Sequence, residues 1–357
     1  MVTTEAPPAV EAPRVASYRT NLVTVVFGAW LTAGVLLDAW AHSNLARLET
    51  FFTPWHAVLY SGFLASAAWV LWTSRAGLRP PRPDLRQMPI AYAPAVLAIA
   101  GFAVCGVADA TWHTVFGIEQ NINILFSPTH LGLAASMLVI LTTPVRAALA
   151  DGTLPAAPGL RRLLPAVLST AFAATLVLLF LEYANAFTFR SIDVVGGLSS
   201  LDDYFTGRLA AAVAVTNLVL TVPLLVLARA WTLPFGAATM LYTLCGALSG
   251  VLTGFAEPGL LALLPPVGLA IDLGTRWLRP GPDRPVRLLV FAALAPLLTW
   301  SVYVAVAYAI APPLRYAPDL GVNEHPEAVV ELYTGLPIVQ ALLGLLAAVL
   351  LRRPRRI

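Results

Sequence analysis

The chain has 357 residues and a formal net charge of +3, but only 11% of its residues are charged while 58% are hydrophobic. A soluble globular protein carries about 25% charged residues, so this composition excludes a purely water-soluble protein and indicates a polytopic membrane protein. All 22 basic residues are arginines, spread over short connections without interleaved aromatic positions, which excludes a nucleic-acid partner.

The N-terminal segment, residues 1–17, precedes the first apolar stretch. It is rich in proline and alanine, and it lacks the basic start followed directly by an apolar run that a signal peptide has. We therefore expect a disordered cytoplasmic tail.

Beyond this tail, the chain offers about ten apolar stretches of the roughly 20 residues that a helix needs to cross a bilayer. Pro265 and Pro266 predict a short or broken eighth span, because proline removes a backbone hydrogen bond. The expected fold is an all-α integral membrane bundle, with four spans in residues 18–150 and about six in residues 151–357. The spans are placed near residues 21–42, 54–73, 90–113, 128–149, 162–186, 208–230, 234–255, 258–274, 286–311 and 329–351.

The arginines predict how the bundle is oriented. With the tail in the cytoplasm, 18 of the 22 arginines fall on the cytoplasmic side, and only Arg47, Arg190, Arg208 and Arg315 fall outside. The reverse orientation would violate the positive-inside rule. Both termini are therefore expected in the cytoplasm, and the protein in the cell membrane.

The outer ends of the first four spans carry an acid and histidine motif that occurs twice. Each copy has an aspartate, a histidine four residues later, a glutamate in the loop, and a Pro-x-His unit that starts the next span. The aspartates are offset by 71 residues and the Pro-x-His units by 74. The two copies are Asp38, His42, Glu49, Pro54 and His56, and then Asp109, His113, Glu119, Pro128 and His130.

Helix geometry predicts that the aspartate and the two histidines of each copy lie close together. Residues i and i+4 share one helix face, so each aspartate lies beneath the histidine that follows it. Thr53 and Ser127 are typical N-caps, and the proline after each suits the first helical position, which places the second histidine in the first turn. Both hairpins begin on the cytoplasmic side, so we expect parallel copies, related by a pseudo-twofold axis along the membrane normal, whose triads lie together.

Two imidazoles and one carboxylate are a ligand set for Fe(II), Cu(II) or Zn(II) that leaves coordination positions open. We therefore predict a transition-metal site whose ligands are the first triad, Asp38, His42 and His56, and the second triad, Asp109, His113 and His130. Copper is the first choice, with iron or zinc as alternatives. Glu49 and Glu119 are expected first to accept hydrogen bonds from imidazole N–H groups, and the alternatives are that they bridge the metal as ligands or act as catalytic proton shuttles. The alternative interpretation is a structural polar network at the headgroup level.

At these residues the sequence resembles the C subunit of the copper membrane monooxygenases, the family that includes particulate methane and ammonia monooxygenases. The resemblance covers roughly the first 150 residues. It maps the first triad onto one copper set of the family and the second triad onto a neighbouring set, where the family has asparagine and this chain has Asp109. It implies a copper centre at the outer membrane edge that activates O2 and oxidises a small apolar substrate arriving through the lipid, with companion subunits or a homo-oligomer as partners.

The same ligands are compatible with two other functions. One is a metal-ion or proton-coupled transporter or metal-handling protein, and the other is a zinc-dependent hydrolase that acts on lipid. Apart from Asp272, few polar residues lie deep in the predicted spans, which weighs against a complete transport pathway.

Residues outside the repeated motif provide weaker indications of function. Glu182, at the outer end of the fifth span, is a candidate further metal ligand, and His325 in the last outer loop is a candidate ligand for an arriving ion. Residues 188–207 are expected to form a solvated outer loop, and Asp272 and Arg276 an i, i+4 pair. The predicted aromatic wall of the substrate space consists of Phe52, Trp55, Trp112 and Phe126.

Overall fold

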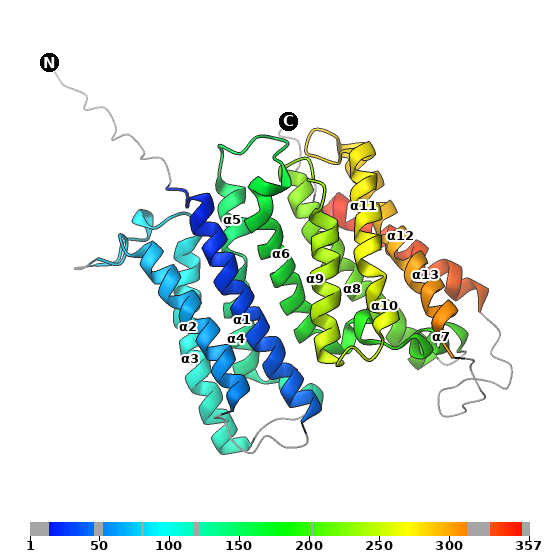
Figure 1. Ribbon diagram of the computed structural model, residues 1–357, viewed down its shortest axis with the longest axis horizontal. Helices are drawn as coiled ribbons and strands as arrows, with labels where there is room; N and C mark the ends of the chain where they lie inside the picture. Colours follow the sequence, from blue (N-terminus) through cyan, green and yellow to red (C-terminus); the bar gives the residue numbers. More distant parts are fainter. Residues whose placement is uncertain are drawn as a thin grey trace.

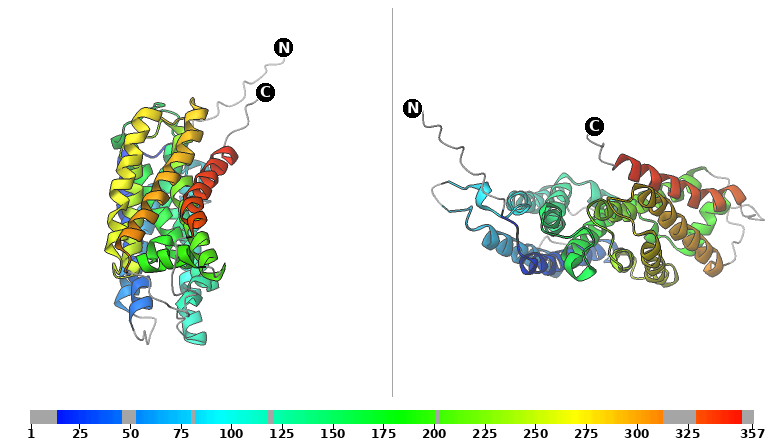
Figure 2. Two further views of the ribbon diagram at one scale, coloured as in Figure 1. Left: turned by 90° about the vertical axis from the view of Figure 1, so that its right-hand side faces the viewer. Right: turned by 90° about the horizontal axis from the view of Figure 1, so that it is seen from above.

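The computed structural model describes residues 14–45, 53–79, 82–117, 121–200, 203–312 and 329–351. Within these ranges all regular structure is helical, and nine helical segments are long and apolar enough to cross a membrane. The helices stand side by side in an elongated array, with the N-terminal helices at one end and the C-terminal helices at the other (Figure 1, Figure 2). The predicted all-α membrane bundle is confirmed.

The helices follow the predicted spans closely. They are α1 (Tyr18–Asn44), α2 (Pro54–Ser74), α3 (Tyr92–Phe116), α4 (Pro128–Leu141), α5 (Thr143–Ala150), α6 (Leu160–Phe180), α7 (Ser191–Ser199), α8 (Asp203–Ala230), α9 (Ala237–Leu252), α10 (Pro258–Ala262), α11 (Leu264–Leu278), α12 (Pro285–Ile310) and α13 (Val330–Leu350). Short 3-10 turns are η1 (Leu85–Gln87), η2 (Asn121–Phe126), η3 (Glu182–Ala184) and η4 (Ala186–Thr188).

Two spans are interrupted, and each interruption lies two residues before a proline. The predicted break of the eighth span falls at Leu263, between α10 and α11, ahead of Pro265. An unpredicted break at Thr142 separates α4 from α5, ahead of Pro144. In both cases the proline nitrogen has no hydrogen to give to the preceding turn. The seventh predicted span is α9, whose 16 residues make it shorter than the other spans.

Two glycines let α1 and α2 approach closely. A Cβ atom at Gly34 would lie 2.7 Å from the Cα atom of Leu59, and one at Gly62 would lie 2.9 Å from the Cα atom of Leu31. Any larger side chain would push the helices apart, so these glycines fix the distance across the first hairpin. The outer end of α1 is therefore held close to the start of α2.

The apolar core is divided by α6. One cluster of buried side chains fills the space between α1, α2, α3 and α4, and includes Leu31, Phe63 and Phe102. A second cluster fills the C-terminal helices around Trp300. Because α6 contributes Leu176 to the first cluster and many residues to the second, it forms a common wall between the two parts.

Two C-terminal expectations need correction. The described residues 188–200 and 203–207 are not a solvated loop, because α7 lies within them and buries Val194 and Leu198 in the C-terminal core. Asp272 is not engaged with Arg276: its carboxylate accepts the backbone N–H groups of Ala238 and Thr239, at 3.1 and 2.9 Å, and so caps the start of α9. The carboxylate satisfies N–H groups that a helix start leaves open, which the sequence spacing does not reveal.

Candidate metal centre

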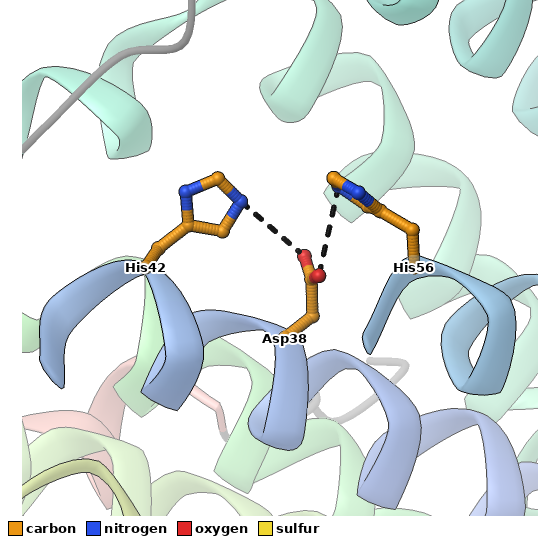
Figure 3. A group of neighbouring side chains, drawn as sticks. All are labelled: Asp38, His42 and His56. Carbon is orange, nitrogen blue, oxygen red and sulfur yellow. Dashed lines mark ion pairs between the residues drawn. The ribbon is translucent and has the colours of Figure 1, made fainter. Parts of the chain in front are cut away.

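The first triad forms where α1 ends and α2 begins. Asp38 and His42 are one turn apart on α1, and His56 is in the first turn of α2. The carboxylate of Asp38 lies between the two imidazole rings, 3.8 Å from His42 Nε2 and 3.6 Å from His56 Nε2 (Figure 3). The i, i+4 spacing and the tight hairpin together bring the three groups to one point.

The second triad has the same arrangement at the end of α3 and the start of α4. His113 Nε2 lies 3.5 Å from one oxygen of Asp109, and His130 Nε2 lies 3.2 Å from the other. In each triad, three ligand atoms, one from each residue, lie within 4.8 Å of one another. Each group of side chains could therefore hold a metal ion.

The distances are compatible with a coordination sphere. Three of the four contacts between nitrogen and oxygen measure 3.5–3.8 Å, which is beyond ordinary hydrogen-bond length. Two atoms bound to one tetrahedral ion at about 2.0–2.1 Å lie about 3.4 Å apart. The observed spacing matches that edge closely, so small side-chain movements would bring these atoms within bonding distance of one ion.

The opposite nitrogen of each ring in the second triad fixes which atom is left to bind a cation. His130 Nδ1 lies 2.9 Å from the carbonyl oxygen of Ile124, and His113 Nδ1 lies 3.4 Å from that of Gly117. A carbonyl oxygen only accepts hydrogen bonds, so Nδ1 carries the proton in each contact. In the neutral ring, Nε2 then presents a lone pair to the carboxylate of Asp109. A cation could bind at this lone pair, whereas a protonated ring would instead donate its Nε2–H to the carboxylate.

The start of α2 behaves as predicted, whereas the start of α4 does not. Thr53 accepts the backbone N–H of His56 at 3.1 Å, and its hydroxyl also lies 3.1 Å from His56 Nδ1. Ser127 makes no such cap. Its hydroxyl instead bonds to that of Thr129, at 2.8 Å, and Thr129 donates to Asp109 Oδ1 at 2.7 Å.

Thr129 is therefore a hydrogen-bond partner of the second triad that sequence reasoning missed. It stands between Pro128 and His130, at the position where the first copy of the motif has Trp55. Trp55 packs edge-on against Trp40, with ring centroids 6.0 Å apart. The change of residue type within the Pro-x-His unit was the only available signal for this difference.

The two triads lie side by side. The rings of His56 and His113 have their centroids 6.3 Å apart, so α2 and α3 bring the triads into contact. All six side chains are at most 13% exposed. Among the described residues, Asp38 Oδ1 and His42 Nε2 have no hydrogen-bond partner, although both atoms are buried. Buried polar atoms normally have partners, which is consistent with an ion at this position.

Several predicted residues lie elsewhere. Glu49, Glu119, Phe52 and His325 are outside the described residues, so their predicted roles stay predictions. Glu182 is in η3, where it lines a polar pocket with His42 but belongs to neither triad. Of the predicted aromatic wall, Trp112 packs on Phe116 and Phe126 on Tyr183, and neither lines the apolar groove beside the triads, so the wall stays a prediction.

Comparisons of the chain with protein-family models, with curated proteins and with solved structures found no match.

Proposed function

We propose that this protein is an integral membrane oxidoreductase that holds one transition-metal ion in each triad and oxidises a small apolar substrate with O2. The observation that carries the proposal is the pair of adjacent, buried triads. In each triad the imidazole nitrogens face carboxylate oxygens at 3.2–3.8 Å, so that three ligand atoms lie close enough to hold one ion. Copper is the preferred ion, because imidazole ligands suit it and because the motif resembles the C subunit of the copper membrane monooxygenases. Iron and zinc are the alternatives.

In this proposal a bound ion would supply the redox chemistry with O2, and the chain supplies the environment. The histidines and aspartates hold the ion, and the Ile124 carbonyl orients the ring of His130. Burial of the triads keeps bulk water away from the reacting groups. The roles predicted for Glu49 and Glu119, as acceptors of imidazole N–H groups or as proton shuttles, stay predictions.

The distribution of arginines supports a centre near the outer membrane face. Among the described residues, only Arg190 and Arg208 lie at the end of the bundle that carries the triads, and the other arginines lie at the opposite end. By the positive-inside rule, the arginine-rich end is cytoplasmic. The termini are then cytoplasmic, and the proposed centre is extracytoplasmic.

An apolar groove supports a substrate that arrives from the lipid. The groove has a volume of about 670 Å3 and lies between α2 and α3, with Phe63 and Val107 among its walls. Tyr60 also lines it, and the centroid of its ring lies 6.4 Å from that of His56. A Cβ atom at Gly106 would lie 3.2 Å from the Tyr60 ring, so glycine leaves room for this side chain. Tyr60 thus stands between the groove and the first triad.

The surroundings of Asp272 favour an oxidoreductase over a transporter. This carboxylate was the strongest candidate for an ion-binding group deep in the C-terminal spans. Its oxygens accept two backbone N–H groups and the hydroxyl of Thr239, at 2.6 Å, so the group is already satisfied by a helix start. It offers no continuation of an ion path inward from the triads.

Metal analysis of the purified full-length protein tests the proposal. We expect two equivalents of copper or iron per chain, O2 consumption with an apolar substrate, and loss of the metal in the double variant His42→Ala, His113→Ala. A protein that retains its metal in this variant would contradict the assigned ligands. Zinc as the native metal, without O2 consumption, would favour a hydrolase, and metal flux into proteoliposomes would favour a transporter.

A further inference from the structure

A polar pocket adjoins the first triad on the side away from the apolar groove. It has a volume of about 470 Å3 and is lined by residues from the end of α1, the η2 and η3 turns and the start of α7. Its walls include His42 and Ser43 from α1, and Glu182 from η3. The groove at Tyr60 contains none of these residues. The first triad is therefore bordered by two separate spaces, of which this one is the more polar.

Glu182 is the notable group in this pocket. Within the described part of the chain its carboxylate has neither an ion pair nor a hydrogen bond, although the residue is half-buried. Burial raises the pKa of the Glu182 carboxyl, because the charged form loses part of its hydration. An unpaired carboxylate at a buried position is stabilised by an arriving cation.

The other charged groups of the pocket are already engaged. Asp193 pairs with Arg190, with Nε and Oδ2 3.1 Å apart, and Arg208 lies over the ring of Phe189 at 5.4 Å. Phe189, Asp193 and Arg208 also border a smaller hollow of about 190 Å3 beside α7, so they form the far wall of the pocket. Glu182 is left as the acidic group that shares the pocket with a triad histidine.

We propose that this pocket is the aqueous route by which a hydrophilic divalent cation reaches the triads, with Glu182 as the first ligand and His42 as the next. The inference rests on the proposed metal centre. It gives the C-terminal half a role in metal binding, because residues of η3 and α7 line the route. Two spaces then serve two kinds of molecule: ions and water pass by Glu182, and apolar molecules reach Tyr60 from the lipid. His42 connects the route to the centre, because its Nε2 already faces Asp38.

The test measures how fast the full-length protein in nanodiscs takes up Co²⁺, followed by its visible absorption, and how fast EDTA removes the ion. Ser43→Trp fills the polar pocket, and Glu182→Gln removes the carboxylate without changing its shape. Thr111→Trp is the matched control, because Thr111 is also exposed beside a triad but lines the apolar groove.

We expect Ser43→Trp and Glu182→Gln to slow both uptake and removal by about tenfold or more, with an unchanged number of ions at saturation. Thr111→Trp should leave both rates as in the wild type. Unchanged rates in the isosteric Glu182→Gln and in Ser43→Trp, or equal slowing in Thr111→Trp, would overturn the route while leaving the metal centre intact. Failure of the wild type to bind Co²⁺ at all would overturn both the route and the centre.

Discussion

The two triads have the same residue types in the same order, but their surroundings differ. Asp109 receives a hydrogen bond from Thr129 and its side chain is 2% exposed, whereas Asp38 Oδ1 has no hydrogen-bond partner among the described residues and its side chain is 12% exposed. The contacts between nitrogen and oxygen are also shorter around Asp109. The same residue types therefore form one triad that is held more firmly by its neighbours and one that is held less firmly.

The difference in surroundings leads us to expect different roles for the two triads. The first triad borders the polar pocket through His42 and lies beside the wall of the apolar groove through His56 and Tyr60. The second triad is held by carbonyl and hydroxyl groups at His130, His113 and Asp109. We expect the second triad to bind its ion more tightly and the first to exchange its ion and face the substrate. The following variants test this difference.

The largest effect is expected when either carboxylate is removed. Asp109→Ala should abolish ion binding at the second triad, because two histidines alone are a poor site, and Asp38→Ala should do the same at the first. Each variant should retain one equivalent of metal by elemental analysis, and the ion that remains in Asp38→Ala should be the more tightly held one. Loss of both ions in either variant would mean that the six groups form one site instead of two.

Thr129→Val should sharpen the comparison without removing a ligand. The substitution keeps the shape of the side chain but removes the hydroxyl that donates to Asp109. We expect the affinity of the second triad to fall by about 10–100-fold, as is common when a hydrogen-bond partner of a ligand is lost. Competition with a chelator measures this affinity. Thr114→Val, on the exposed side of α3, is the control, and an equal loss there would remove the special role of Thr129.

Tyr60→Ala should act on the first triad alone. Removing the ring opens the wall between the apolar groove and His56, so a lipid-soluble chelator such as bipyridine should extract the first ion faster. The rate of extraction by EDTA should stay unchanged, because EDTA does not enter through lipid. Faster extraction from the second triad, or no change with bipyridine, would contradict the position assigned to Tyr60.

The smallest expected effect distinguishes the two helix starts. Thr53→Ala should destabilise the protein by about 1 kcal/mol, because the hydroxyl caps α2 and contacts His56. Ser127→Ala should cost less, since Ser127 caps no backbone group and reaches Asp109 only through Thr129. Unfolding in mixed micelles at increasing SDS fractions compares the two. A larger loss in Ser127→Ala would contradict this account of the caps.

The sequence predicted what depends on local periodicity. The spans follow from the length of the apolar stretches, and the proximity of each aspartate to the next histidine follows from the i, i+4 spacing. The break at Leu263 follows from Pro265, and the cap at Thr53 from residue type. These features need no knowledge of distant contacts.

The features that sequence reasoning missed depend on residues far apart in the chain or on choices between equivalent partners. Nothing in the spacing tells whether Ser127 bonds to a backbone N–H or to Thr129. The pocket joining His42 to Glu182 and the cap that Asp272 gives to α9 bring together segments separated by many residues. The parallel relation of the two hairpins stays a prediction.

Anomalous X-ray diffraction from crystals of the purified protein tests the central claim most directly. The account predicts two anomalous peaks at the absorption edge of the bound transition metal, one between Asp38, His42 and His56 and one between Asp109, His113 and His130, each with ligand atoms at about 2.0–2.2 Å. A folded, metal-supplemented protein without such peaks, with its imidazoles in direct contact with the carboxylates, would contradict it.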